Sequence, residues 1–136
     1  MHIPVIANGN ILHPDDIQRC MAETGCDAVM SAEPHLYNPA LFLPGPVSAL
    51  HYPRCDRLAL EYIAIVQEQV PDTAWACGKG HLFKLLKLPL KRFLSVRNDL
   101  GRARDVEQAK ALVETLTGLI DVTVDCYFCC PKKRPI

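Results

Sequence analysis

Two short polar stretches follow directly after apolar runs, and their residue types suit the binding of an anion. Asn8-Gly9-Asn10 follows the apolar run 3–7, and Ser31-Ala32-Glu33 follows the apolar run 28–30. In a parallel α/β architecture, ligands bind at the carboxyl ends of strands, where main-chain N–H groups and helix N-termini can hold an oxyanion. Gly9 would let the main chain approach such a group closely. The same pattern also fits an ordinary turn, and the sequence leaves both interpretations open.

Positively charged residues are concentrated in the second half of the chain and form a second candidate binding site. Residues 78–110 carry nine Lys and Arg against three Asp and Glu, whereas residues 1–45 carry five acids against the single base Arg19. The whole chain has 15 bases and 15 acids, so its net charge favours no partner. Lys84, Lys87 and Lys91 are spaced to share one helical face. That face either meets an anionic partner or is simply solvated.

The cysteines form a third candidate site, for a metal ion. Cys126-x-x-Cys129-Cys130 has half of the spacing of a zinc site, and Cys55, Cys77 and His81 are the residues available as further ligands. The alternative is an irregular tail with free thiols. We favour the tail and predict no metal site.

The elements that must position the two polar stretches form one βαβ unit. We expect parallel strands near residues 3–8 and 27–31, with a helix over 14–24 packed across them. Pro14 and the two acids after it begin the helix, whose dipole would favour an anion, and Gly25 ends it. A complete (β/α)₈ barrel takes about 250 residues. Residues 1–45 are therefore predicted to be a slice of a larger α/β fold.

The rest of the chain is predicted to be mostly helical. Residues 46–55 are interpreted as a linker, 56–120 as a helical domain and 121–136 as an irregular tail. Pro89 should kink or break the helix that carries the lysines. In the last helix, Asp105 with Gln108 should form the N-cap and Gly118 should mark the end.

Composition narrows the class of protein further. The apolar share of 49% and the charged share of 22% are typical of a globular protein. The apolar runs are too short for a transmembrane helix, and the N-terminus does not resemble a secretory signal. Seven cysteines in this context are read as thiols. We expect a cytoplasmic location, or a nuclear one.

Four stretches resemble the tRNA-dihydrouridine synthase family, in particular its eukaryotic D-loop (16/17-type) members. They are IPVIANGNI at residues 3–11, ETGCDAVMSAE at 23–33, LYNPALF at 36–42 and GHLFKLL at 80–86. Residues 43–57 and 118–136 do not carry the resemblance. It implies the C-terminal piece of an FMN-binding TIM barrel, the (β/α)₈ fold, followed by the start of a helical tRNA-binding domain.

The resemblance also implies a function. The chain would be a fragment of a flavin-dependent enzyme that reduces uridine to dihydrouridine in the tRNA D-loop, with FMN as cofactor and NADPH as reductant. The alternative is a non-catalytic basic helical RNA-binding remnant or an inert splice fragment. By position, Asn8, Gly9 and Asn10 match the FMN-phosphate loop after the seventh strand, and Ala32 and Glu33 match the phosphate-contacting pair after the eighth.

The sequence departs from the family at this second loop. Many relatives have Gly-Arg at the pair, whereas Glu33 would repel phosphate and Pro34 removes one N–H. The family's catalytic cysteine, its flavin-contacting lysine and its substrate-side histidine lie on earlier strands that this sequence lacks. We therefore assign no catalytic residue and expect the isolated chain, read as a truncated or alternatively started product, to be inactive. Cys20 and Cys26 are predicted to be buried thiols.

The helical part is expected to contact tRNA through phosphates, with little base-specific readout. We expect no membrane contact and no obligate protein partner. The residues predicted to touch RNA are His81, Lys84, Lys87, Lys91, Arg92 and Arg97.

Overall fold

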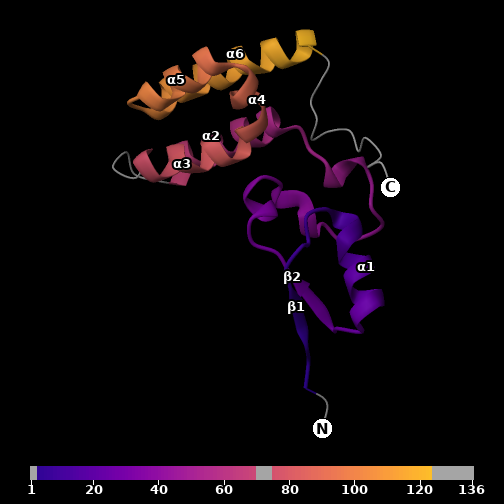
Figure 1. Ribbon diagram of the computed structural model, residues 1–136. Coiled ribbons are helices and arrows are strands. Elements are labelled where there is room, and N and C mark those ends of the chain that lie inside the picture. The colour runs from indigo at the N-terminus through magenta and orange to yellow at the C-terminus, as the bar shows by residue number, and fades with distance from the viewer. Residues whose placement is uncertain (1–2, 70–74, 124–136) are drawn as a thin grey trace. The chain divides into compact units, whose positions relative to one another are not determined.

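The computed structural model describes residues 3–69 and 75–123, and the chain divides into two compact units between Tyr52 and Pro53 (Figure 1). The fold is mixed α/β, mostly helical, with one parallel pair of strands. The range 46–55, predicted as a linker, contains this boundary, the 3₁₀ turn η3 (Ala49–His51) and the first residue of a helix. Among the described residues, no helix has the length and apolarity needed to cross a bilayer.

The first unit contains the expected βαβ arrangement. Strand β1 (Ile6–Asn8) is followed by helix α1 (Pro14–Thr24) and strand β2 (Ala28–Met30). The two strands are parallel, and their register pairs Ile6 with Ala28 and Asn8 with Met30. Parallel strands need a crossover between them, and α1 supplies it. The predicted pairing is confirmed, although both strands are shorter than expected.

Local residues set both ends of α1, as predicted. Pro14 occupies the first helical position, and Gly25 ends the helix in the left-handed conformation at φ 68°, with its N–H donating to Met21 O at 3.0 Å. The carboxylate of Asp16 accepts the N–H groups of Leu12 and His13 at 2.9 and 2.8 Å. Burial alone would raise the pKa of Asp16, but these two bonds and Arg19 lower it.

The remainder of the first unit is a loop with three 3₁₀ turns: η1 (Pro34–Leu36), η2 (Pro39–Phe42) and η3. Two buried side chains hold residues 38–51 together. Asn38 Nδ2 donates to His51 O at 2.8 Å, and the imidazole of His51 lies 3.0 Å from Leu43 O and accepts the N–H of Ser48 at 3.1 Å. A groove of about 570 Å³ lies between this loop and the start of α1.

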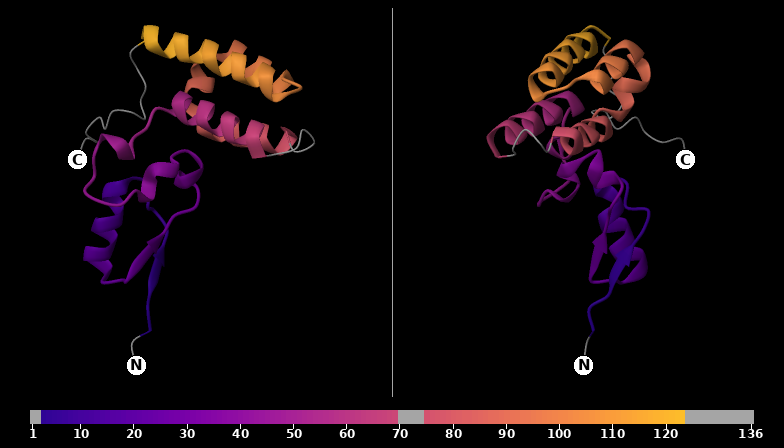
Figure 2. Two further views of the ribbon diagram at one scale, coloured as in Figure 1. Left: turned by 180° about the vertical axis from the view of Figure 1, so that it is seen from behind. Right: turned by 90° about the vertical axis from the view of Figure 1, so that its left-hand side faces the viewer.

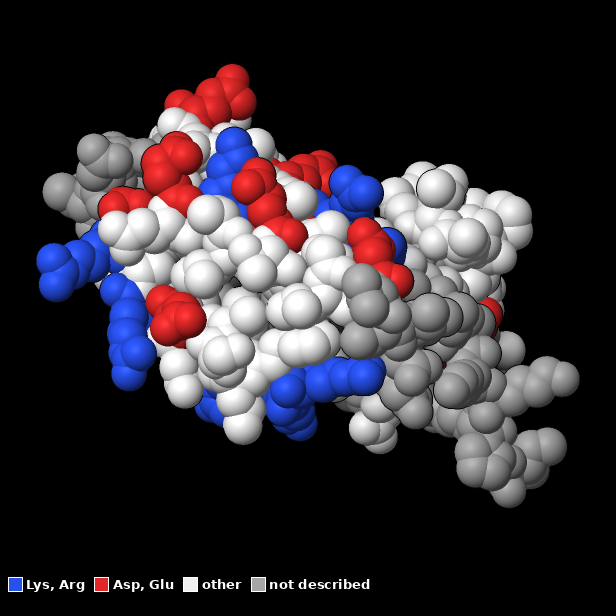
Figure 3. Space-filling model, turned by 90° about the horizontal axis from the view of Figure 1, so that it is seen from above, with Lys and Arg blue, Asp and Glu red and all other residues white. Residues whose placement is uncertain are grey.

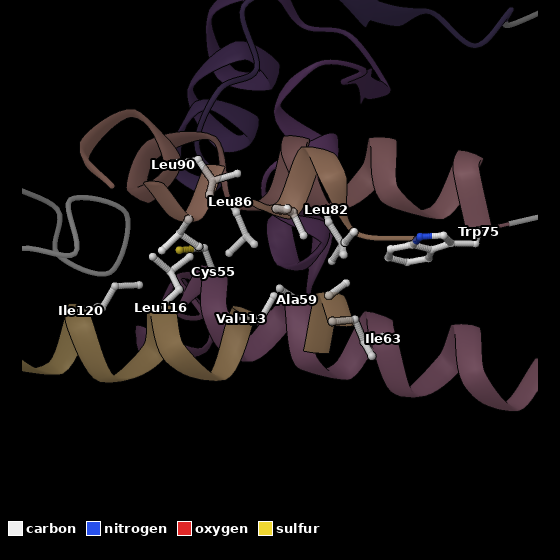
Figure 4. Close-up of a cluster of buried hydrophobic side chains, with 14 residues drawn as sticks. Cys55, Ala59, Ile63, Trp75, Leu82, Leu86, Leu90, Val113, Leu116 and Ile120 are labelled. Carbon is white, nitrogen blue, oxygen red and sulfur yellow. The ribbon is translucent and has the colours of Figure 1, made fainter. Parts of the chain in front are cut away.

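Five helices build the second unit around one apolar core. They form two layers, with α2 beside α3 and α5 beside α6 (Figure 2), and α2 also packs on α6. Leu82 and Leu86 are fully buried, and Figure 4 shows them pointing into the cluster. The helices are α2 (Cys55–Gln69), α3 (Trp75–Leu85), α4 (Lys87–Arg92), α5 (Leu94–Arg102) and α6 (Val106–Thr123).

The helix that carries the lysines breaks three residues before Pro89. The chain leaves the helical path at Leu86, between α3 and α4, and Pro89 is the third residue of α4. At that position its missing N–H leaves no helical bond unmade, and the break avoids a clash between its ring and the carbonyl of Leu85. Leu90 then bonds back to Leu86 O at 3.0 Å.

Helix α6 begins as predicted but does not end at Gly118. Asp105 Oδ1 accepts the N–H of Gln108 at 2.8 Å, and the Gln108 side chain in turn accepts the N–H of Arg104 at 3.0 Å. The helix continues through Gly118 to Thr123. An interior glycine costs only about 1 kcal/mol, and burial of Ile120 in the core outweighs that cost.

Candidate cofactor loops and nucleic-acid interface

The fold brings the two predicted loops together at one edge of the strand pair. Asn8 and Met30 are register partners, so residues 9–10 and 31–33 both leave from the carboxyl ends of neighbouring strands. Ser31 Oγ donates to Ile11 O at 2.8 Å and joins the two loops. Gly9 has φ 117°, and no atom lies within 4 Å of where its Cβ would be. An approaching group therefore meets open main chain at this position.

The charges at this edge do not favour an anion. Glu33 is the only ionised side chain of the two loops, and Tyr37 donates its hydroxyl to Glu33 Oε1 at 2.6 Å. The N-terminus of α1 offers an anion fewer free N–H donors than its dipole suggests, because the carboxylate of Asp16 already accepts two N–H groups there. A phosphate at this edge would therefore depend on main-chain donors.

The six residues predicted to touch RNA are all exposed, but they do not share one helix. Lys84 belongs to α3, whereas Lys87 and Lys91 belong to α4, so the break at Leu86 interrupts the spacing on which the prediction relied. Lys87 and Lys91, four residues apart, share a face of α4. Figure 3 shows Lys and Arg side chains along the lower margin and left end of the view, where acidic side chains are few, and further Lys and Arg side chains among the acidic ones nearer the upper margin.

Arg92, which is one of these six residues, and Lys79 have partners within the second unit. The Arg92 guanidinium lies over the Phe93 ring, 5.8 Å from its centroid. Lys79 donates its Nζ to Gly101 O and Ala103 O at 3.0 and 2.8 Å, so it caps the C-terminus of α5 from α3. Its sequence neighbours gave no sign of this role, because the carbonyls it reaches are more than twenty residues away.

The described cysteines do not converge on one point. Cys55 is buried at the start of α2, and Figure 4 shows it in the left half of the core cluster, whereas Trp75 lies at the right-hand end. Cys77 follows Trp75 by two residues and is exposed. Cys55 therefore does not join Cys77 and His81 around one ion. Cys126, Cys129 and Cys130 lie outside the described residues. Among the described residues, no three His, Cys, Asp or Glu side chains are grouped so as to hold a metal ion.

The pairing of the Tyr62 and His81 rings was not predicted from the sequence. Tyr62 on α2 and His81 on α3 lie with ring centroids 5.8 Å apart and planes inclined by 55°. Nineteen residues separate them, and only the packing of α2 on α3 brings them together. Burial, and to a lesser degree Cys77, raise the pKa of Tyr62.

A βαβ unit with paired loops at its carboxyl edge, followed by a helical unit with a basic surface, defines a class of α/β protein with an appended helical domain. The chain belongs to the dihydrouridine synthase family, whose sequence pattern matches residues 1–125. This match includes residues 43–57 and part of 118–136. The expectation that residues 43–57 and 118–125 lie outside the resemblance was therefore wrong, whereas residues 126–136 lie outside the match.

The chain is similar to tRNA-dihydrouridine(16/17) synthases [NAD(P)(+)] of two yeasts. It is 42% identical over 120 residues to the protein of Schizosaccharomyces pombe and 44% identical over 98 residues to that of Saccharomyces cerevisiae. These alignments cover 82% and 70% of this chain, but 30% and 23% of the relatives. A protein of Mus musculus, named as tRNA-dihydrouridine(16/17) synthase-like, is 37% identical to this chain over 114 residues, which are 84% of this chain and 22% of that protein. The chain thus spans less than a third of these relatives.

Proposed function

We propose that the chain is the part of a flavin-dependent tRNA-dihydrouridine synthase that holds the FMN phosphate and contacts tRNA. The activity to which it contributes is the reduction of uridine to dihydrouridine in the tRNA D-loop, with NADPH as reductant. One observation carries the proposal: the two loops meet at the carboxyl edge of parallel strands in a chain whose family match spans residues 1–125.

Residues 1–45 are proposed to be the last βαβ unit of a (β/α)₈ barrel, with the helical domain after it. The burial of the strands supports this assignment, because Val5, Ile6 and Met30 are 58%, 56% and 49% exposed. Barrel strands are normally covered on one face by the packed interior and on the other by helices. The exposure fits strands that belong to a larger sheet.

The proposed phosphate contacts are the main chain of Asn8, Gly9 and Asn10 and that of Ala32 and Glu33. The open main chain at Gly9 fits this role, whereas the carboxylate of Glu33 weakens it. When bound, FMN would supply the hydride chemistry, and these residues would position its phosphate. Because we assign no catalytic residue, the chain by itself is expected not to turn over.

The phosphate loop is tested by comparing FMN with riboflavin, which lacks the phosphate, in a fluorescence-quenching titration. Gly9→Val should lower the affinity for FMN and leave that for riboflavin unchanged, because a side chain at φ 117° distorts the loop. Gly45→Val is the matched control, because Gly45 also has a positive φ, of 102°, and open space around it. Equal affinity of the wild-type chain for the two flavins would contradict the proposed loop.

The proposed partner is tRNA, and the exposed basic residues of α3, α4 and α5 support it. Each neutralised phosphate should contribute a slope of about −0.7 to −0.9 to the dependence of log affinity on log salt. Changing Lys84, Lys87 and Lys91 together to Glu should abolish binding while the helical CD spectrum stays unchanged. Lys110→Glu on α6 is the single-site control. Coinciding salt titrations for the wild-type chain and the triple variant would contradict the RNA interface.

The exposed basic residues also favour the alternative, a non-catalytic RNA-binding remnant. The flavin and tRNA titrations distinguish it from the synthase fragment. A colourless chain with salt-sensitive tRNA binding supports the remnant, and a yellow chain with bound FMN supports the synthase fragment. The proposed location is the cytoplasm or the nucleus. The free thiols of Cys20, Cys26 and Cys77 agree with such a reducing compartment.

A further inference from the structure

The pair of rings formed by Tyr62 and His81 lies at the surface where α2 packs against α3. His81 is exposed, whereas Tyr62 is half-buried and packs against the apolar core of the second unit. The Tyr62 hydroxyl lies beside Gly78, at 3.6 Å from where a Cβ of that residue would be. Packing therefore holds Tyr62 in place, and its ring supports the exposed ring of His81.

The part of α3 beside His81 carries positive charge and no carboxylate. Lys84 lies three residues after His81 on α3 and is exposed, so the two side chains are neighbours on one face. Gly80 next to His81 has no atom within 4 Å of a Cβ position, and α3 contains no Asp or Glu. A flat group that carries negative charge at one end can approach the exposed His81 ring without meeting a carboxylate of α3.

We propose that the His81 ring, supported by Tyr62, stacks on an unpaired RNA base while Lys84 holds an adjacent phosphate. This inference rests on the proposed tRNA contact and adds a preference for single-stranded nucleotides. Phosphate contacts alone are made by duplex and loop RNA alike, whereas stacking on a side chain needs a base that has left its helix. The pair thus directs the basic surface toward a loop of tRNA.

The test compares two RNA probes of equal length and charge, a stem–loop with an unpaired loop and a blunt duplex, each bound to the full chain at several salt concentrations. His81→Ala should weaken stem–loop binding by about fivefold or more, as expected for one stacked base, and leave duplex binding and the salt slope unchanged. His81→Tyr should restore stem–loop binding, because it keeps an aromatic ring. Lys84→Ala should instead lower the salt slope by about one contact for both probes.

The outcomes separate this inference from the proposed function. If the wild-type chain binds neither probe, the tRNA contact is wrong and the stacking site is wrong with it. If Lys84→Ala changes the salt slope but His81→Ala leaves stem–loop binding unchanged, the tRNA contact stands and the stacking site is refuted. An equal loss with both probes also refutes it, as does failure of His81→Tyr to restore binding. The helical CD spectrum of each variant shows that the fold is retained.

Discussion

The side chain of Asp56 should contribute more to the stability of the second unit than any other ionised group described there. It is 0% exposed at the start of α2, and Arg54 grips it with two bonds, Nε to Oδ1 at 3.0 Å and Nη2 to Oδ2 at 2.8 Å. Arg54 also reaches Asp121 Oδ1 on α6 at 2.6 Å. Burial alone would raise the pKa of Asp56, but the bonds from Arg54 and its charge lower it.

The magnitude of the Asp56→Ala change follows from this geometry. Removing one partner of a buried ion pair typically costs about 3–5 kcal/mol because the other charge is left unpaired. Arg54 is 34% exposed and keeps Asp121, so part of that penalty is avoided. We expect a loss of about 2–3 kcal/mol in the free energy of unfolding. Asp121→Ala removes the exposed half of the same network and should cost less than about 1 kcal/mol.

Urea denaturation followed by CD at 222 nm measures this loss, since the second unit contains five of the six described α-helices. Because the folded pKa of Asp56 lies below its unfolded value of about 3.9, its contribution is present above that pH and is lost as the pH falls through the folded pKa. The wild-type and Asp56→Ala stabilities should therefore converge in acid. Equal destabilisation by Asp56→Ala and Asp121→Ala, or a difference that persists unchanged at low pH, would refute the reasoning.

Three further predictions follow from burial and charge. Leu100→Ala should cost about 2–5 kcal/mol in urea denaturation, because Leu100 is fully buried, whereas Leu94→Ala on the same helix, at a site 56% exposed, should cost less than about 0.5. Glu33→Gln should raise the affinity for FMN about two- to fivefold and leave that for riboflavin unchanged, since it removes the negative charge of the two proposed phosphate-binding loops. An unchanged FMN affinity argues against a phosphate there. The wild-type chain should bind the dye ANS at neutral pH and self-associate with concentration, because Val5, Ile6 and Met30 are exposed. A monomer that leaves ANS fluorescence unchanged contradicts this last expectation.

The two proposed functional surfaces were predicted from the sequence to different degrees. The pairing of the loops around Gly9 and Ala32 follows from two apolar runs joined by a capped helix, because such a unit forces the strands to be parallel. The basic interface was predicted as one helical face, and the break at Leu86 divides it between α3 and α4. Pro89 predicted that the helix would be interrupted, but the break lies at Leu86. A proline is incompatible with an unbroken helix before it, and this alone does not fix the residue at which the backbone departs from helical geometry.

The features that the sequence by itself determined are helix ends, which depend on residues within about four positions of one another. Pro14 and Gly25 set the ends of α1, and Asp105 with Gln108 set the start of α6, because each cap satisfies main-chain groups of its own turn.

Only the tertiary structure decided the features that join distant segments. Gly118 did not end α6, because Ile120 beyond it completes the core. Lys79 became a cap for α5, and Tyr62 met His81, through the packing of helices far apart in sequence. These contacts depend on the geometry of burial, and local propensities carry no information about which distant group will occupy a given space.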